Sequence, residues 1–270
     1  MKKHTVITGS TRGIGFGLVR QFLSLGYSAT ITGRSKEGVE KALETLEGDF
    51  PREQIHGTVW NVHNWDKTRA VWDETMDRFG RIDVWINNAG IYQPDSSFSE
   101  IGPGEIDNLI RTNLLAAMII SGTVYRCMLA QGFGAVYNME GLGSDGRKIP
   151  GTILYGTSKQ GISYFTDGLA METAGGPVLV GTLSPGMVLT DLLLAPVRKN
   201  PEAHEESLKI YRILADEVEP VTEYLARKVD RNRKHGAKIS WLTTWKVLGR
   251  FIGSIFKKRK IVDRYLENNF

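Results

Sequence analysis

The feature that most constrains the fold of this 270-residue chain is a regular alternation of short apolar runs with longer amphipathic stretches. The short runs have the length and β-branched content of buried strands, and the longer ones carry apolar residues at helical spacing. The predicted strands are 4–8, 27–33, 54–60, 82–87, 134–139 and 177–184, with 238–242 as a seventh. This alternation predicts an α/β fold: a Rossmann-type, doubly wound parallel sheet of about seven strands with helices on both faces.

The predicted helices lie between these strands, and no linker divides the chain. They cover residues 14–25, 36–47, 65–79, 105–131 and 154–174. We therefore predict a single domain over residues 1–270. Within it, residues 186–236 are mostly helical and charged in pattern, and we expect them to form a lid or substrate region. Right-handed crossovers place the carboxyl ends of all the strands on one edge of the sheet, where ligands bind.

Composition excludes several classes of protein. A single cysteine, Cys127, rules out an intramolecular disulfide, and the histidines show no metal-ligand spacing, so we expect no metal. The chain enters its first strand directly from MKKHTVITGS, without the pattern of a signal or transit peptide. No apolar run reaches the roughly 18–20 residues of a membrane span. These observations predict a cytoplasmic protein.

Charge is distributed unevenly along the chain. Between Arg227 and Lys260 there are 12 basic residues and one acid, which leaves 22 basic and 29 acidic residues elsewhere. Residues 241–260 also carry apolar residues at helical spacing and end in four basic residues, which predicts a basic amphipathic helix. Such a helix either lies peripherally on an anionic membrane or packs on its own domain or an oligomer partner. No nucleic-acid-reading motif accompanies the charge, so we expect no nucleic acid partner.

The segment TGSTRGIG, residues 8–15, joins the first predicted strand to the first predicted helix. Its glycines allow a tight turn and a close approach to a pyrophosphate, which the helix N-terminus then attracts. Arg12 lies in this loop, and Arg34 follows the second strand, where an NAD enzyme usually has an acid. Because guanidinium groups bind phosphate in a bidentate manner, the two arginines favour NADPH over NADH.

Further motifs follow in order: WINNAG (85–90), Asn113 in RTNLL, YGTSK (155–159) and SPGMVLT (184–190). Together with the glycine loop they resemble the short-chain dehydrogenase/reductase family over most of the chain. The resemblance implies a small-molecule substrate and a homo-oligomer built on long helices. It implies cofactor contacts for Gly9, Ser10, Thr11, Arg12, Gly13, Ile14, Gly15, Arg34, Asn61, Val62, Asn88, Ala89, Gly90, Tyr155, Lys159, Pro185, Gly186, Val188 and Thr190.

Tyr155 is the predicted general acid. A free phenol has a pKa near 10, too high for efficient proton transfer at neutral pH. Lys159 lies one helical turn later on the same face, and we expect its charge to lower the pKa of Tyr155. The resemblance implies that Lys159 also holds the nicotinamide ribose. It further implies that Asn113 is a catalytic residue that holds a water for proton relay to Lys159.

The segment before this pair is unusual. Aligning NMEG on the family pattern places Gly141, which has no side chain, where the substrate-activating serine normally stands. Ser144 is then the candidate replacement, provided that the loop brings it into the same space. Glu140 takes part only if it is protonated or binds a cation; otherwise Tyr155 alone polarises the carbonyl.

Within the family, three segments resemble chlorophyll b reductases: NMEGLGSDG (138–146), SPGMVLTDLLL (184–194) and the tail from KISWLTTWKVL (238–248) onward. The implied activity is NADPH-dependent reduction of the 7-formyl group of chlorophyll b or chlorophyllide b to a hydroxymethyl group. The glycines of the first segment would make room for a flat macrocycle. Two alternatives stay open: a general reductase of a smaller ketone or aldehyde, and a non-catalytic NADPH-binding sensor.

Overall fold

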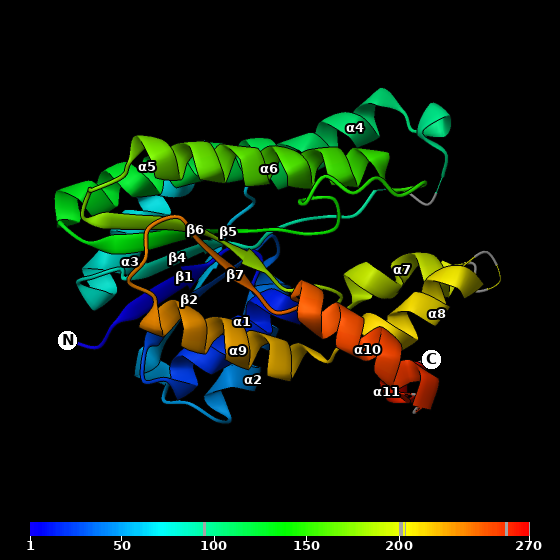
Figure 1. Ribbon diagram of the computed structural model, residues 1–270. Helices are drawn as coiled ribbons and strands as arrows, with labels where there is room; N and C mark the ends of the chain where they lie inside the picture. The colour runs from blue at the N-terminus through cyan, green and yellow to red at the C-terminus, as the bar shows by residue number, and fades with distance from the viewer. Residues whose placement is uncertain (94–95, 200–201, 203, 257–258, 270) are drawn as a thin grey trace.

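Seven parallel strands form one sheet in the order β3-β2-β1-β4-β5-β6-β7 (Figure 1). The computed structural model describes residues 1–93, 96–199, 202, 204–256 and 259–269. The strands are β1 (His4–Ile7), β2 (Ser28–Gly33), β3 (Ile55–Val59), β4 (Val84–Asn87), β5 (Gly134–Met139), β6 (Val178–Ser184) and β7 (Ala237–Ser240). The predicted Rossmann-type sheet is confirmed. Its order reverses between β1 and β4, and a ligand crevice forms at such a switch point.

Helices cover both faces of the sheet (Figure 1). Those of the alternating core are α1 (Gly13–Ser24), α2 (Lys36–Glu47), α3 (Thr68–Phe79), α4 (Pro103–Ile110), α5 (Ala116–Gln131), α6 (Ile153–Glu172) and α9 (Val218–Arg231). Later in the chain lie α7 (Asp191–Lys199), α8 (Glu205–Leu214), α10 (Thr244–Phe256) and α11 (Ile261–Asn269). The α1, α2 and α9 helices pack on one face, and α3, α5 and α6 on the other.

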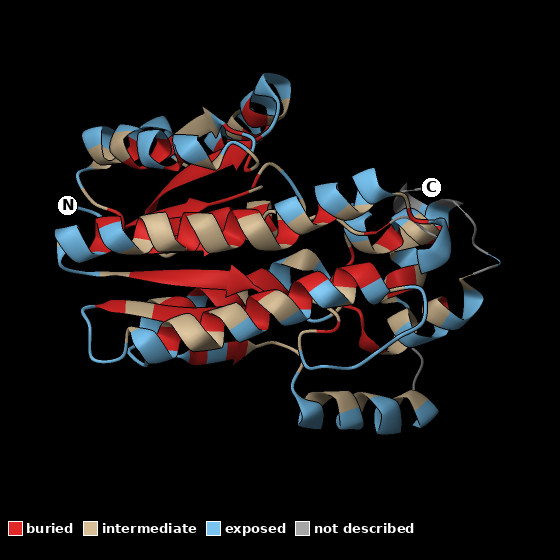
Figure 2. Cartoon of the chain, turned by 90° about the horizontal axis from the view of Figure 1, so that it is seen from above, coloured by how far each residue is buried: buried red, intermediate tan, exposed pale blue. Residues whose placement is uncertain are grey.

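The core consists of a hydrophobic layer on each side of the sheet. Figure 2 shows the strands behind the helices coloured as buried. Successive residues of a strand point to opposite faces, so Ile7 belongs to the layer under α1, whereas Val6 belongs to the layer under α5. Ile86 and Trp85 divide in the same way. Burial on both faces explains why the strand sequences are almost continuously apolar.

The predicted helix 105–131 is interrupted by a π-helical turn, Arg111–Leu115, between α4 and α5. Among the described residues, the stretch Pro103–Gln131 is long and apolar enough to cross a membrane by length and composition. However, 44% of the most apolar 18-residue part of this stretch is buried inside the fold, and Ile120 and Val124 belong to the core. Packing against the sheet therefore accounts for its apolar content.

The predicted lid region, 186–236, divides into two structural parts. The loop after β6, α7 and Tyr211 of α8 line the cavity at the strand ends, as a lid would. The α9 helix instead packs against α1, with Val221 and Leu225 fully buried. Only the first part of the predicted region is therefore placed to contact a substrate. The predicted helix 241–260 corresponds to α10, and its residues 257–258 lie outside the described part of the chain.

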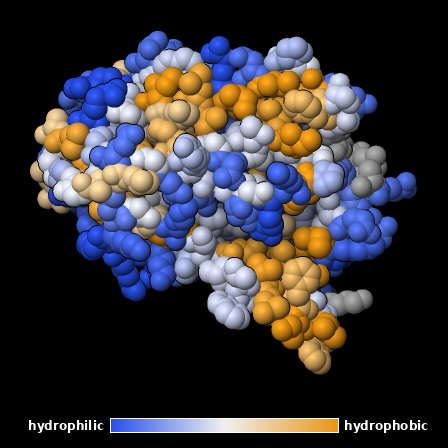
Figure 3. All heavy atoms as spheres, turned by 45° about the horizontal axis from the view of Figure 1, so that its top comes forward, coloured by the Kyte–Doolittle hydropathy of each residue, from blue (hydrophilic) through white to orange (hydrophobic). Residues whose placement is uncertain are grey.

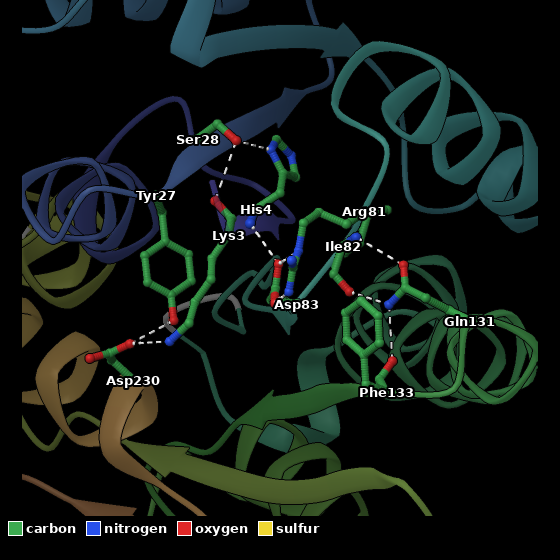
Figure 4. Close-up of polar contacts among 10 residues, drawn as sticks. All are labelled: Lys3, His4, Tyr27, Ser28, Arg81, Ile82, Asp83, Gln131, Phe133 and Asp230. Atoms are coloured by element: carbon green, nitrogen blue, oxygen red, sulfur yellow. Dashed lines mark hydrogen bonds and ion pairs between the residues drawn. The ribbon is translucent and has the colours of Figure 1, made fainter. Parts of the chain in front are cut away.

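Paired polar groups close the amino-terminal end of the sheet (Figure 4). The backbone N–H of His4 donates to Asp83 at 2.8 Å, and the His4 ring bonds the hydroxyl of Ser28 at 2.8 Å. The Tyr27 hydroxyl donates to Asp230, at the end of α9, at 2.8 Å. These contacts connect the starts of β1, β2 and β4 to the helix that packs beneath them.

Candidate active site

A cavity of about 1110 Å³ opens at the carboxyl ends of the strands. It runs from the loop after β1, past the ends of β2 to β5, to α6 and the segment that follows β6. The predicted residues that line it are Gly9, Thr11, Arg12, Gly13, Ile14, Gly15, Arg34, Asn61, Val62, Asn88, Ala89, Gly90, Tyr155, Lys159, Pro185, Gly186, Val188 and Thr190. Ser10, Asn113 and Ser144 are not among the lining residues.

The glycine loop forms one wall of the cavity. Gly9 adopts a left-handed φ of 61°. A Cβ on Gly15 would lie 2.5 Å from Nδ2 of Asn88 and 2.7 Å from the carbonyl oxygen of Gly9, so only glycine fits there. The α1 helix begins at Gly13, and the Arg12 side chain does not cap it. The first N–H groups of α1 are therefore available to an anion at the cavity.

Ser10 lies beneath the loop rather than in the cavity. It is fully buried, its hydroxyl donates to the carbonyl of Ile7 at 2.7 Å, and it accepts from the N–H of Thr32 at 3.0 Å. The structure thus gives Ser10 a supporting role instead of the predicted cofactor contact. Asn88 supports the loop in the same way, because its Nδ2 donates to the carbonyls of Thr8 and Gly9.

Two exposed arginines lie on the rim of the cavity, near the glycine loop. Arg34 directly follows β2, and Arg12 precedes α1. The Arg12 side chain is 76% exposed, and its Nη1 lies 3.5 Å from Oδ2 of Asp191. Two guanidinium groups at this rim suit a phosphate group bound outside the glycine loop.

Tyr155 and Lys159 lie one turn apart on α6, with 8% and 5% of their surfaces exposed. Burial, with a smaller effect of Tyr92, raises the pKa of Tyr155 above its usual value. Burial also lowers the pKa of Lys159 to about 8, although Glu140 opposes this. The Lys159 Nζ donates to the carbonyl of Met139 at 3.0 Å. The predicted lowering of the Tyr155 pKa is therefore not found here, because burial has the largest effect on the phenol and raises its pKa.

Asn113 lies in the π-helical turn and is buried. Its amide group makes two 2.8 Å bonds with the backbone of Ile91, one as donor and one as acceptor. Its Nδ2 also donates to the hydroxyl of Ser158 at 3.2 Å. Asn113 thus holds the loop after β4 against α6. Its predicted role in proton relay becomes part of the proposal below.

Gln93 was not predicted from the sequence. Its Oε1 accepts from the backbone N–H of Tyr155 at 3.0 Å, and its Nε2 donates to the carbonyl of Gly151 at 2.6 Å. These two bonds fix the start of α6 and hence the position of Tyr155. The only sequence signal is a polar residue shortly after WINNAG, which by itself indicates no such contact.

The segment Glu140–Ser144 shows what lies beside Tyr155 in place of the usual serine. A Cβ on Gly141 would lie 2.5 Å from the hydroxyl of Tyr155, so the backbone itself borders the phenol. The Ser144 hydroxyl accepts from the N–H of Gly141 at 3.1 Å and donates to the carbonyl of Lys159 at 3.2 Å. This placement contradicts the predicted catalytic role of Ser144, because its hydroxyl stabilises the turn. Glu140 is buried, and its Oε1 accepts from Ser163 at 3.2 Å.

Comparisons with known proteins agree with this geometry. Chlorophyll(ide) b reductase NOL of Oryza sativa subsp. japonica is 34% identical over 235 residues, covering 84% of this chain and 66% of that protein. The chain thus spans just under two thirds of that relative. The 3alpha-hydroxysteroid dehydrogenase of Mediterraneibacter gnavus is 31% identical, covering 72% of this chain and 76% of that protein.

Among solved structures, the one described as ElxO with NADP bound has a TM-score of 0.78 to this chain at 26% identity. The match covers 89% of this chain and 97% of the other. A family model described as short chain dehydrogenase matches residues 3–200. The chain is therefore an oxidoreductase that belongs to the short-chain dehydrogenase family.

Proposed function

We propose that this protein is an NADPH-dependent carbonyl reductase that converts the 7-formyl group of chlorophyll b or chlorophyllide b to a hydroxymethyl group. The observation that carries the proposal is the bare backbone of Gly141 beside the buried Tyr155 hydroxyl. Backbone, rather than a serine side chain, therefore borders the proton donor, and it projects no side chain toward a substrate. Similarity to chlorophyll(ide) b reductase NOL supports the choice of substrate.

The residues of the cavity fit a dinucleotide. The uncapped start of α1 and the glycine loop suit the diphosphate, and Arg12 and Arg34 suit a 2′-phosphate, which favours NADPH over NADH. Lys159 and the segment 185–190 would hold the nicotinamide end. ElxO, a structural neighbour, is described with NADP bound. Bound NADPH supplies the hydride that reduces the carbonyl carbon.

Tyr155 supplies the proton to the carbonyl oxygen. The raised pKa keeps its phenol protonated before the reaction, as a proton donor requires. Lys159, with a pKa of about 8, carries a positive charge at neutral pH and stabilises the phenolate that remains. We also propose that Asn113 holds a water through which a proton returns to Lys159. General acid catalysis of this kind contributes about 10²- to 10⁴-fold in rate.

The outer walls of the cavity suit a flat, apolar molecule. They come from the turn after β5, from α7 and from α8, and they include Leu142, Leu193, Pro196 and Tyr211. Large ligands usually bind between apolar walls, with a few polar groups that fix their orientation. In this cavity, Tyr155 and the carboxyl end of β5 would provide that orientation for a formyl group.

The test is incubation of the purified protein with NADPH and chlorophyll b, followed by the absorption spectrum and chromatography of the products. We expect 7-hydroxymethyl chlorophyll a, formed about 10²- to 10⁴-fold more slowly by Tyr155→Phe. The unfolding temperature of Tyr155→Phe, compared with the wild type, controls for its fold. Turnover of small aldehydes only would favour the general reductase, and tight NADPH binding without any turnover would favour the sensor.

We also propose that the protein is a homo-oligomer built on α5 and α6. Large apolar side chains are exposed on these two helices, among them Leu129 (42%), Tyr164 (81%) and Met171 (80%). Apolar residues in such positions often contact a second subunit. Light scattering over a range of protein concentrations tests this, and a monomer at every concentration would contradict it.

A further inference from the structure

The α10 helix presents its apolar side to solvent. None of its residues is buried, and in Figure 2 it is the separate helix at the bottom, with no residue coloured as buried. Its exposed apolar residues are Trp245 (81%), Leu248 (49%), Phe251 (39%), Ile252 (52%), Ile255 (78%) and Phe256 (84%). Figure 3 shows them as the hydrophobic projection at the lower right. A surface helix normally has the opposite orientation, with its apolar stripe facing the core.

The polar side of α10 is fixed to the protein by a buried carboxylate. Asp216 lies between α8 and α9, and its side chain is only 7% exposed. It accepts hydrogen bonds from Nε1 of Trp241 at 2.6 Å and from Nη2 of Arg250 at 2.7 Å. Arg259, beyond the helix, binds the same carboxylate at 2.6 Å. The orientation of α10 is therefore set by charged hydrogen bonds rather than by hydrophobic packing.

This orientation excludes packing of the apolar stripe on the chain's own domain. A rotation that buried Leu248 and Ile252 against the chain's own core would remove Arg250 from Asp216 and leave a buried charge unpaired. Such a loss is strongly unfavourable. The exposed stripe is too apolar to be left in water without cost, since burial contributes about 25 cal/mol per Å². It therefore indicates a partner outside the chain.

Charge indicates which partner. Residues 241–260 contain six basic residues and no acidic one. Within α10 itself, Lys246 and Arg250 are the only charged residues. A second copy of this surface would place like charges together, whereas an anionic bilayer complements them. Trp245 at one end and Phe256 at the other are residue types that favour the boundary between headgroups and acyl chains.

We propose that α10 docks flat on an anionic lipid bilayer, with its apolar side in the interfacial region. The docked helix lies next to the cavity. Asp216 pairs with Val188 in an isolated β-bridge, and its backbone N–H donates to the carbonyl of Met187 at 3.0 Å. Both Met187 and Val188 line the cavity. The bilayer surface would therefore be held beside the site where substrate binds, whatever that substrate is.

Sedimentation of the full chain with lipid vesicles tests the proposal, without pigment or NADPH. We expect binding to vesicles of phosphatidylcholine mixed with phosphatidylglycerol, weaker binding to phosphatidylcholine alone, and weaker binding at high salt. The double variant Leu248→Ser/Ile252→Ser should bind the anionic vesicles at least about tenfold more weakly. The matched control is Val59→Ser/Phe98→Ser, which changes two apolar residues of similar exposure, 50% and 45%, elsewhere on the surface. This control should bind like the wild type.

Three results would overturn the proposal: no binding of the wild type to anionic vesicles, an equal loss in the control variant, or a dimer that only the α10 variant dissociates, with no lipid binding. The last result would identify a second copy as the partner. Circular dichroism of both variants confirms that they fold, as expected for substitutions of half-exposed residues. Because substrate and cofactor are absent, the outcome is independent of whether chlorophyll b is reduced.

Discussion

The two ends of the same sheet are built in opposite ways. At the amino-terminal end, polar groups bind one another (Figure 4). Gln131 makes two hydrogen bonds with the backbone of Ile82, and the Asp83 carboxylate accepts a hydrogen bond from the N–H of His4. At the carboxyl end, the first N–H groups of α1, the Tyr155 hydroxyl and two arginines face a cavity instead. One end stabilises the fold, and the other leaves groups available for ligands.

A substitution in the glycine loop should have the largest effect on the site at the carboxyl end of the sheet. Gly15→Ala would place its Cβ 2.7 Å from the carbonyl oxygen of Gly9 and 2.8 Å from Cα of Ser10, so the backbone must shift. We expect a stability loss of about 1–3 kcal/mol and at least about tenfold weaker NADPH binding. Gly104→Ala in α4 is the control, because a Cβ there meets no atom within 4 Å. It should be neutral or stabilise by up to about 1 kcal/mol. Normal NADPH binding by Gly15→Ala would contradict this account of the loop.

Acidic pH should lower the stability that contacts at the amino-terminal end of the sheet give to the fold. Burial, aided by the nearby charges of His56 and Arg78, lowers the pKa of His4 from 6.5 to about 3. In the unfolded chain His4 therefore takes up a proton near pH 6.5, whereas in the folded chain it does so only near pH 3. The stability that neutral His4 contributes is complete above that range and is lost as pH falls. We expect a loss of about 2 kcal/mol between pH 7 and pH 5 from this group, measured by urea unfolding.

His4→Gln is the control for this pH dependence. It should be less stable at neutral pH, since it loses the ring bonds to Ser28 and Thr30, but it should show a flatter response to acid. An equally steep response in His4→Gln would assign the acid sensitivity to other groups.

Arg34 tests whether the rim of the cavity selects the cofactor. Arg34→Ala should weaken NADPH binding by about tenfold, the usual contribution of a charge-assisted hydrogen bond, and should leave NADH binding unchanged. Arg20→Ala is the control, because Arg20 pairs with Asp49 and is not among the cavity-lining residues. Equal losses for both cofactors with Arg34→Ala would show that the arginine does not read the 2′-phosphate.

Substitution of Glu140 should have the smallest effect on the site at the carboxyl end of the sheet. Its charge raises the pKa of Lys159, against the larger effect of burial. Glu140→Gln should therefore lower the pKa of Lys159, and activity should fall at a lower pH as the solution becomes alkaline. Ser163→Ala is the matched control, because it removes the hydrogen bond to Glu140 but keeps the charge. Identical pH–rate profiles for Glu140→Gln and the wild type would exclude this electrostatic role.

The fold could be predicted from the sequence because its signals are local. Strands buried on both faces must be apolar, and the intervening helices must carry a periodic stripe. The glycine loop was predictable for the same reason, since the left-handed φ of Gly9 and the close approach of Gly15 to the carbonyl of Gly9 belong to a single turn. Both features depend on residues close together in the chain.

The features that the sequence did not predict depend on contacts between distant residues. Ser144 was proposed as a catalytic group, but its hydroxyl is fixed by the carbonyl of Lys159. The contact of Gln93 with Tyr155 spans 62 residues. The periodicity of 241–260 predicted a helix, and α10 covers Thr244–Phe256 of it, but the orientation of α10 depends on Asp216, which no local pattern indicates.

The carboxylate of Asp216 has a consequence for shortening this protein. A chain cut after Ser240 would keep every strand of the sheet and, judged by topology, would look complete. It would lose Trp241, Arg250 and Arg259, which among the described residues are the side chains that bind the Asp216 carboxylate. A buried charge left without its partners typically costs about 3–5 kcal/mol. A minimal version of this enzyme should therefore have a neutral residue at position 216 before its C-terminal helices are removed.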